Sequence, residues 1–165
     1  MLERAIVATC ERLGRTDWSN QVPVASGIAG PSAERRRAID LVREAGPGHF
    51  ELVELKIASD TPLYAALELI GYACIWLLSR GERGDDASLL LAADRLDAVV
   101  LAPESYYTRY RLKGLETVLD TELAALGVAH GVKLRFRFES LPDDLIRPPF
   151  LDQQIVSLLD ARRRL

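Results

Sequence analysis

The sequence predicts one α/β domain, because strand-like and helix-like segments alternate along its 165 residues. The clearest strand is the apolar run 98–102 before Pro103, which is typical of a strand buried on both faces. Residues 132–139 alternate apolar and charged side chains, as in a half-exposed strand. The expected order is helix, three strands, helix, strand, helix and strand, and a strand, a crossover helix and another strand imply at least one parallel, right-handed unit.

The first third of the chain is expected to form one helix and three strands. These elements are an amphipathic helix 2–13, a short strand 22–28, and strands 36–43 and 50–57. Gly14 is placed to end the helix, and Gly30-Pro31 closes the first strand. The turn Gly46-Pro47-Gly48 separates the other two strands, which indicates a hairpin.

The apolar segment 62–78 is expected to be a core helix, with Thr61 as N-cap, Pro62 in the first turn and Gly81 at its end. Its length approaches that of a membrane span. Glu68 lies in its middle, however, where a carboxylate costs about 2.5–3.5 kcal/mol in a bilayer. A helix buried between a sheet and other helices has the same composition without that cost, so we expect no membrane association.

The elements of the second half are less uniform in pattern. Residues 88–93 fit either a strand or a short helix. A leucine stripe over 112–126 predicts a helix closed by Gly127. A proline-containing tail and a short terminal helix, residues 141–165, are expected to follow a core of about residues 1–140.

The composition is that of a globular protein, with 48% apolar and 27% charged residues. Two distant cysteines and the absence of a signal-peptide pattern predict a cytoplasmic protein. A net charge of −3 argues against binding nucleic acid by bulk electrostatics. The arginine run 162–164 is expected to be solvated. Only Lys56, Lys113 and Lys133 are lysines among 21 basic residues, which makes each one more informative.

Glu54 and Lys56 are expected on the same face of strand 50–57, because side chains alternate along a strand. Asp40, on the preceding strand, brings a second carboxylate to this place if the hairpin register allows it. Two carboxylates with a backbone carbonyl and waters suit Mg²⁺ or Mn²⁺. Such an ion lowers the pKa of a bound water and stabilises a phosphoryl group, while Lys56 would orient the water or neutralise negative charge.

Asp40, thirteen further residues and then Glu54-Leu55-Lys56 resemble the motif of the PD-(D/E)XK nuclease superfamily, the restriction-endonuclease-like fold. The resemblance covers about residues 1–140 and implies a three-layer α/β/α domain with a mixed, about five-stranded sheet. It implies that Asp40, Glu54 and the Leu55 carbonyl bind the metal and that Lys56 serves the attacking water. The implied reaction is hydrolysis of phosphodiester bonds in DNA, or alternatively in RNA.

The chain departs from the family pattern at two positions. Ile39 rather than proline precedes the first acid, and the apolar helix carries Glu68-x-x-x-Tyr72 where some branches carry Gln-x-x-x-Tyr. Tyr72 is therefore a candidate substrate contact, although a polar edge on a core helix explains this pair equally. An acid of the first helix often helps to hold the metal in this superfamily, and Glu3 and Glu11 are both candidates.

Basic residues of the last strand are further candidate substrate contacts. Lys133, Arg135 and Arg137 are expected about 6–7 Å apart, close to the phosphate spacing of a nucleic-acid strand. In the resembled fold this strand lies at the sheet edge, where basic side chains also prevent aggregation, and the two roles are equally supported. Three tyrosines fit either base stacking or packing at a helix start: Tyr106, Tyr107 and Tyr110.

Two functions are compatible with these patterns. The complete acid–acid–lysine set favours a nuclease. The acidic pI near 5.5 and the small size favour a non-catalytic nucleic-acid-binding or protein-interaction module on the same fold. A homodimer is compatible with both functions.

Overall fold

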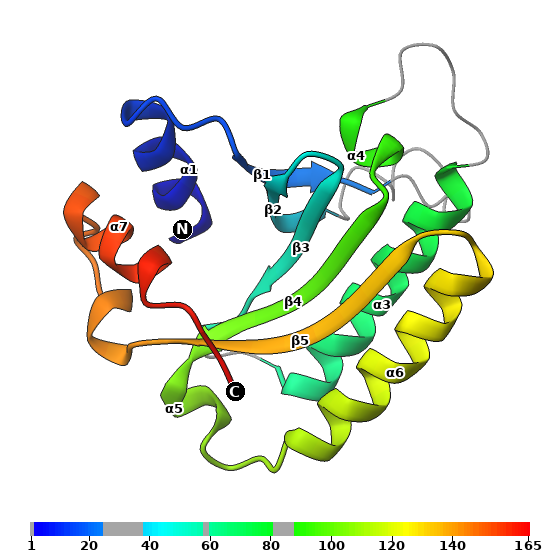
Figure 1. Ribbon diagram of the computed structural model, residues 1–165. Helices are drawn as coiled ribbons and strands as arrows, with labels where there is room; N and C mark the ends of the chain where they lie inside the picture. Colours follow the sequence, from blue (N-terminus) through cyan, green and yellow to red (C-terminus); the bar gives the residue numbers. More distant parts are fainter. Residues whose placement is uncertain (1, 25–37, 58–59, 81–87) are drawn as a thin grey trace, which may run out of the picture.

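The computed structural model describes residues 2–24, 38–57, 60–80 and 88–165. Figure 1 shows one open sheet with helices on both of its faces. The sheet has six strands in the order β1-β2-β3-β4-β5-β6. The central pairs β3–β4 and β4–β5 are parallel, and the pairs β1–β2, β2–β3 and β5–β6 are antiparallel. The chain is therefore an α/β protein with a single mixed, open sheet flanked by helices.

The helices and strands follow the expected order, with short helices added between them. The strands are β1 (Trp18–Pro23), β2 (Ala38–Gly46), β3 (His49–Leu55), β4 (Arg95–Pro103), β5 (Lys133–Leu141) and β6 (Arg163–Arg164). The helices are α1 (Leu2–Arg12), α3 (Pro62–Ser79), α4 (Leu89–Ala92), α5 (Glu104–Tyr107), α6 (Lys113–Ala129) and α7 (Asp152–Asp160), with the 3-10 helix η2 (Asp143–Ile146) before α7.

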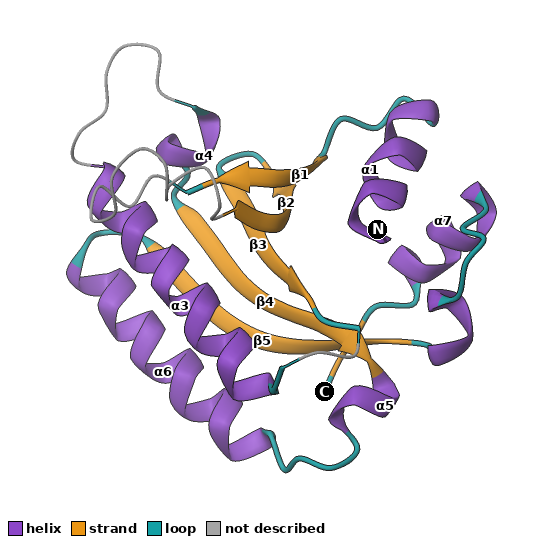
Figure 2. Ribbon diagram, turned by 180° about the vertical axis from the view of Figure 1, so that it is seen from behind, coloured by secondary structure: helices purple, strands orange, loops and turns teal. Residues whose placement is uncertain are grey.

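Each face of the sheet has its own hydrophobic core, because side chains alternate along the central strands. One core lies under α3 and α6 and contains Leu52, Val100 and Phe136. The opposite core lies under α1 and α7 and contains Val53 and Val99. Figures 1 and 2 show these two pairs of helices on opposite sides of the strands. Alternate residues of β3, β4 and β5 therefore point to opposite faces of the sheet, and so to different cores.

The predicted hairpin of β2 and β3 is confirmed. The two strands pair antiparallel from Leu41↔Val53 to Gly46↔His49, and Gly48 adopts a left-handed conformation (φ 67°) in the turn. β3 then pairs in parallel with β4 across the helix α3, as the strand–helix–strand pattern predicts. This arrangement delivers the end of β3 and the start of α3 to the same end of the sheet (Figure 2).

Helix α3 begins as its sequence predicts. The Thr61 side chain accepts a hydrogen bond from the Tyr64 N–H at 3.2 Å, and Pro62 occupies the first turn. One face of α3 is buried against the sheet through Ala65, Leu69 and other small or apolar side chains. Among the described residues α3 alone has the length and apolar character of a membrane span, features that it shares with core helices of soluble proteins. The predicted stop at Gly81 lies outside the described residues.

The expected number of strands was wrong, because β6 adds a sixth. β6 has only two residues and pairs with β5 at Glu139 and Ser140, so no apolar alternation identifies it in the sequence. Ion pairs hold this segment instead: Arg164 binds Glu116 at 2.8 Å and Arg162 binds Glu139 at 2.6 Å. Arg162 is buried rather than solvated, with 8% of its side chain exposed. The last part of β5 is consequently not a sheet edge.

The start of the first strand also differs from expectation. β1 begins at Trp18 rather than near residue 22, which was missed because Ser19, Asn20 and Gln21 are all polar and give no apolar alternation that would mark the strand in the sequence. The expected continuation of this strand over 25–28 lies outside the described residues. The ambiguous segment 88–93 contains the short helix α4.

Gly127 does not end its helix, because α6 continues to Ala129. Its lack of a side chain serves packing instead. A Cβ at this position would lie 2.8 Å from the backbone nitrogen of Leu134 and 2.9 Å from the carbonyl oxygen of Val132. Glycine is required here for the close approach of α6 to β5.

Candidate active site

The candidate site is assembled where β2, β3 and α3 meet. Asp40 lies on β2, one residue beyond the part that pairs with β3, and its Oδ2 accepts a hydrogen bond from the Leu55 N–H at 3.0 Å. The carboxylate thus replaces a ladder bond at the open end of the hairpin. Glu54 and Lys56 follow on β3 and directly after it, and they contact each other, as expected for side chains on one face.

Lys56 is the centre of a small group of charges. Its Nζ lies 2.8 Å from Glu54 Oε1, 3.4 Å from Glu68 Oε2 and 3.5 Å from Asp60 Oδ2. Only 10% of the Lys56 side chain is exposed. Its backbone N–H donates to the Leu101 carbonyl at 3.0 Å, which continues the pairing of β3 with β4 and fixes the position of the amine.

Glu68 and Tyr72 approach the same group from α3. They lie one helical turn apart, and the Tyr72 hydroxyl donates to Glu68 Oε1 at 3.2 Å. Glu68 therefore bridges the Lys56 amine and the Tyr72 hydroxyl. Glu68, which stands where some branches of the resembled superfamily carry glutamine, is thus in direct contact with Lys56. One signal for it is visible in the sequence, which is a lone carboxylate in the middle of an apolar helix.

We call Asp40, Glu54, Lys56 and Glu68 the acidic cluster, because the Lys56 amine contacts Glu54 and Glu68 and its charge also acts on Asp40. Burial, followed by the charge of Asp40, raises the pKa of Glu54 to about 8. Burial also raises the pKa of Asp40, although the Leu55 N–H and Lys56 oppose this shift. Asp40 thus lies close enough to Glu54 for its charge to disfavour ionisation of Glu54. The cluster has fewer positive than negative groups.

A bound divalent cation would supply the positive charge that the acidic cluster lacks. Asp40, which is partly buried, and Glu54, which is buried, are hard oxygen ligands. Mg²⁺ is commonly held by one or two carboxylates with waters and phosphate oxygens completing its shell. Among the described residues, no group of three or more acidic, histidine or cysteine side chains could hold a metal by itself. Asp40 and Glu54 would therefore have to be joined by water, substrate or a backbone carbonyl such as that of Leu55.

The two candidate acids of α1 differ in their relation to the site. The charge of Glu3 contributes to raising the pKa of Asp40, so Glu3 lies within electrostatic range of the acidic cluster. Glu11 is exposed and is not among the charges that act on Asp40 or Glu54. Of these two, Glu3 is the acid that the fold brings toward the cluster.

The basic residues of β5 lie on the other face of the sheet. Their neighbours Leu134, Phe136 and Phe138 point into the core under α3 and α6, so Lys133, Arg135 and Arg137 point away from it. Arg135 binds Asp120 through two hydrogen bonds of 2.8 and 2.6 Å, and Lys133 is exposed. The structure does not bring these three residues together with Asp40, Glu54 and Lys56.

Arg137 belongs to a second group of charges, which we call the ion-pair cluster. This cluster consists of Glu51, Asp97, Arg137, Glu139 and Arg162. The Arg137 guanidinium contacts all three carboxylates, and Arg162 contacts Glu51 at 3.1 Å and Glu139 at 2.6 Å. Burial alone would raise the pKa of Glu51, but the charges of Arg162, Arg137 and Arg43 lower it below its ordinary value.

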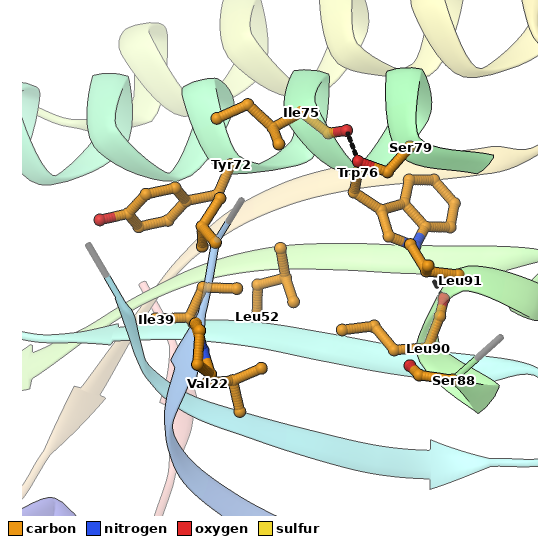
Figure 3. Close-up of a pocket in the computed structure, with 12 residues that line it drawn as sticks. Val22, Ile39, Leu52, Tyr72, Ile75, Trp76, Ser79, Ser88, Leu90 and Leu91 are labelled. Carbon is orange, nitrogen blue, oxygen red and sulfur yellow. Dashed lines mark hydrogen bonds between the residues drawn. The ribbon is translucent and has the colours of Figure 1, made fainter. Parts of the chain in front are cut away.

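Tyr72 separates the acidic cluster from an apolar pocket of about 310 Å³. The pocket lies between α3, α4 and the strands β1 to β3, and Ile39, Leu52 and Trp76 contribute to its walls (Figure 3). Figure 3 shows the Tyr72 ring along the pocket with its hydroxyl pointing away from Trp76. The ring thus contributes to the core while the hydroxyl orients Glu68.

Comparisons with protein-family models, with curated proteins and with solved structures find no match to this chain.

Proposed function

We propose that this chain is a metal-dependent nuclease that hydrolyses phosphodiester bonds, with DNA as the expected substrate and RNA as the alternative. The observation that carries the proposal is the acidic cluster, in which buried Glu54 contacts the Lys56 amine, partly buried Asp40 lies within electrostatic range of both, and positive charge is insufficient. Such strongly perturbed carboxylates are concentrated at functional sites. The acid–acid–lysine combination is also the one that the PD-(D/E)XK resemblance assigns to catalysis.

Asp40 and Glu54 would hold Mg²⁺ or Mn²⁺. When bound, such an ion supplies a coordinated water of lowered pKa and stabilises charge on a phosphoryl group. The hydrogen bond from the Leu55 N–H fixes the Asp40 carboxylate, and the contact with Lys56 fixes that of Glu54. These contacts preorganise two ligands from different strands.

Lys56 would neutralise negative charge on the phosphate or orient the attacking water. The carboxylates around Lys56 raise its pKa despite burial, so the amine remains charged at neutral pH. A charged amine is suited to electrostatic stabilisation and to donating hydrogen bonds. Glu68, held by the Tyr72 hydroxyl, would keep the amine in place beside Glu54.

The fold supports the same proposal at the level of architecture. The order of α1, the strands β1 to β3, the crossover α3, β4, α6 and β5 follows the three-layer restriction-endonuclease-like core that the resemblance implies. We propose that core here, with β6 and α7 as additions. A fold alone does not establish chemistry, so the acidic cluster remains the main argument.

A non-catalytic module on the same fold is the second candidate. One observation favours it: the Lys56 amine is already in contact with Glu54, Glu68 and Asp60, which limits its freedom to contact a substrate. The net charge of −3 agrees with this alternative. The two candidates differ in whether the protein cleaves nucleic acid in the presence of a metal ion.

The test is a cleavage screen over single-stranded, duplex, flap and junction DNA and over RNA, with Mg²⁺, Mn²⁺ or EDTA. We expect metal-dependent cleavage by the wild type and a rate lower by about 10²–10³-fold in Lys56→Ala, because the amine acts on developing charge. Lys113→Ala, which removes an exposed lysine at the start of α6, is the matched control and should cleave normally.

Metal binding supplies an independent measurement. Saturating Mg²⁺ should raise the melting temperature of the wild type and of Lys56→Ala, and it should not raise that of Asp40→Asn, because binding to the folded state alone stabilises it. Absence of cleavage together with absence of a metal-induced shift would reject the nuclease. Equal cleavage by Lys56→Ala and wild type would assign the activity to a contaminant or another site.

A further inference from the structure

Tyr106 has a buried hydroxyl that lacks a hydrogen-bond partner among the described residues. Its neighbour Tyr107 is different, because its hydroxyl contacts the carbonyl oxygens of Val100 at 2.9 Å and Glu139 at 3.2 Å. Buried polar groups in native proteins almost always have a partner, since an unpaired one destabilises the fold. We therefore expect the Tyr106 hydroxyl to have a hydrogen-bond partner that the described part of the chain does not supply.

The position of Tyr106 relates it to the acidic cluster. It lies on α5, which directly follows β4. At this end of the sheet Leu55 pairs with Leu101, and the backbone N–H of Lys56 donates to the Leu101 carbonyl. Figures 1 and 2 both show α5 at the same end of the sheet as the start of α3. Among the charges that act on Tyr106, that of Lys56 has the largest effect on its pKa.

The Tyr106 ring is held in place by its neighbours. It packs edge to face on Tyr107, with ring centroids 5.3 Å apart and an interplanar angle of 79°. Tyr107 packs in turn on Phe138 at 5.9 Å. Burial raises the pKa of Tyr106, so its hydroxyl is protonated at neutral pH and can donate a hydrogen bond. The donor is thus preorganised before any ligand binds.

We propose that Tyr106 is a substrate-binding residue whose hydroxyl donates a hydrogen bond to a non-bridging oxygen of the phosphate that lies beside Lys56. This inference rests on the proposed nuclease function. A phosphate attracted by Lys56 brings acceptor oxygens to this end of the sheet, and none of the described residues offers one to this hydroxyl. A partner supplied by the substrate explains why the hydroxyl has no hydrogen-bond partner among the described residues.

The test compares Tyr106→Phe with Tyr107→Phe, because the two substitutions remove hydroxyls from adjacent tyrosines that differ in their partners. We expect Tyr106→Phe to lower kcat/KM about tenfold or more on the DNA that the wild type cleaves, because a hydrogen bond to a charged oxygen is lost. Its melting temperature should be unchanged or higher, and the Mg²⁺-induced rise should be retained. Tyr107→Phe should melt a few degrees lower and keep its kcat/KM.

Two results would overturn the inference while leaving the nuclease in place. One is a kcat/KM of Tyr106→Phe equal to that of the wild type, which would mean that a water satisfies the hydroxyl. The other is a loss of melting temperature as large as that of Tyr107→Phe, which would mean that the hydroxyl has a structural partner. A wild type that cleaves none of the substrates would overturn the proposed function and this inference together.

Discussion

Glu51 and Glu54 lie three residues apart on β3, and each has 5% of its surface exposed, yet their pKa values shift in opposite directions. The pKa of Glu51 is lowered, whereas that of Glu54 is raised to about 8. Their side chains point to opposite faces of the sheet, where Glu51 joins the ion-pair cluster and Glu54 the acidic cluster. Burial is equal, so the supply of positive charge makes the difference.

The two clusters differ in how completely their charges are balanced. The three carboxylates of the ion-pair cluster all contact Arg137, and Glu51 and Glu139 also contact Arg162. Arg43 and Arg95 add further ion pairs to Glu51 and Asp97. In the acidic cluster the single amine of Lys56 contacts Glu54 and Glu68, and its charge also acts on Asp40. A balanced buried cluster can hold strands and tail together, whereas an unbalanced one favours binding a cation. We therefore assign the first to folding and propose the second for function.

The largest expected effect is a reversal between matched substitutions in the two clusters. Glu51→Gln should lower the stability by about 3–5 kcal/mol, because it leaves buried arginines without a full partner. This corresponds to a drop on the order of 10 °C in melting temperature, while the cleavage rate of the folded protein should persist. Asp40→Asn should instead abolish cleavage and leave the melting temperature in EDTA unchanged or higher, because it relieves repulsion with Glu54.

Thermal melts and cleavage assays on the two variants measure this reversal directly. The side-chain amide oxygen that D40N introduces can still accept the hydrogen bond from the Leu55 N–H, so this contact is expected to survive the substitution. If both substitutions lower the melting temperature and neither changes cleavage, the acidic cluster is a structural element like its counterpart.

The ion-pair cluster should also determine the response to acid. Because the folded-state pKa values of Glu51 and Asp97 are lowered, their stabilisation is present above the unfolded values and is lost as the pH falls through the folded ones. The difference in free energy of unfolding between wild type and Glu51→Gln should therefore be full at pH 7, begin to shrink below about pH 4, and disappear once the pH is below the lowered pKa of Glu51. Denaturant melts across this range measure it; a constant difference would show that charge is not the cause.

Local patterns in the sequence were sufficient for most of the fold. The hairpin, the capped helix α3 and the parallel pairing of β3 with β4 follow from turn residues, Thr61 and apolar runs, and the structure confirms them. β6 could not be predicted, since Arg163 and Arg164 owe their place to pairing with distant residues. The buried state of Arg162 has the same cause, because no local pattern reveals Glu51, 111 residues away, as its partner.

The candidate site was predictable only in part. Alternation places Glu54 and Lys56 on one face, and their contact at 2.8 Å confirms it. The involvement of Glu68 depends on how α3 packs on the sheet, which a helical pattern does not specify. The ion pairs of Arg137 could not be predicted either, because alternation indicates the face on which a side chain lies but not which acids of the neighbouring strands lie beside it.

The smallest expected effect concerns the exposed part of β5 and the choice between its two roles. Arg135 is half exposed and bound to Asp120, so Arg135→Ser should cost only about 0.2–1 kcal/mol of stability. Since Lys133 and Arg135 lie on the opposite face from the acidic cluster, the double substitution to Ser should leave DNA affinity and its salt dependence unchanged. Affinity measured over a range of salt concentrations checks this. A slope shallower by about 0.9 log units per lost contact would instead show that phosphates follow this strand, and the ion-pair face would then share in substrate binding.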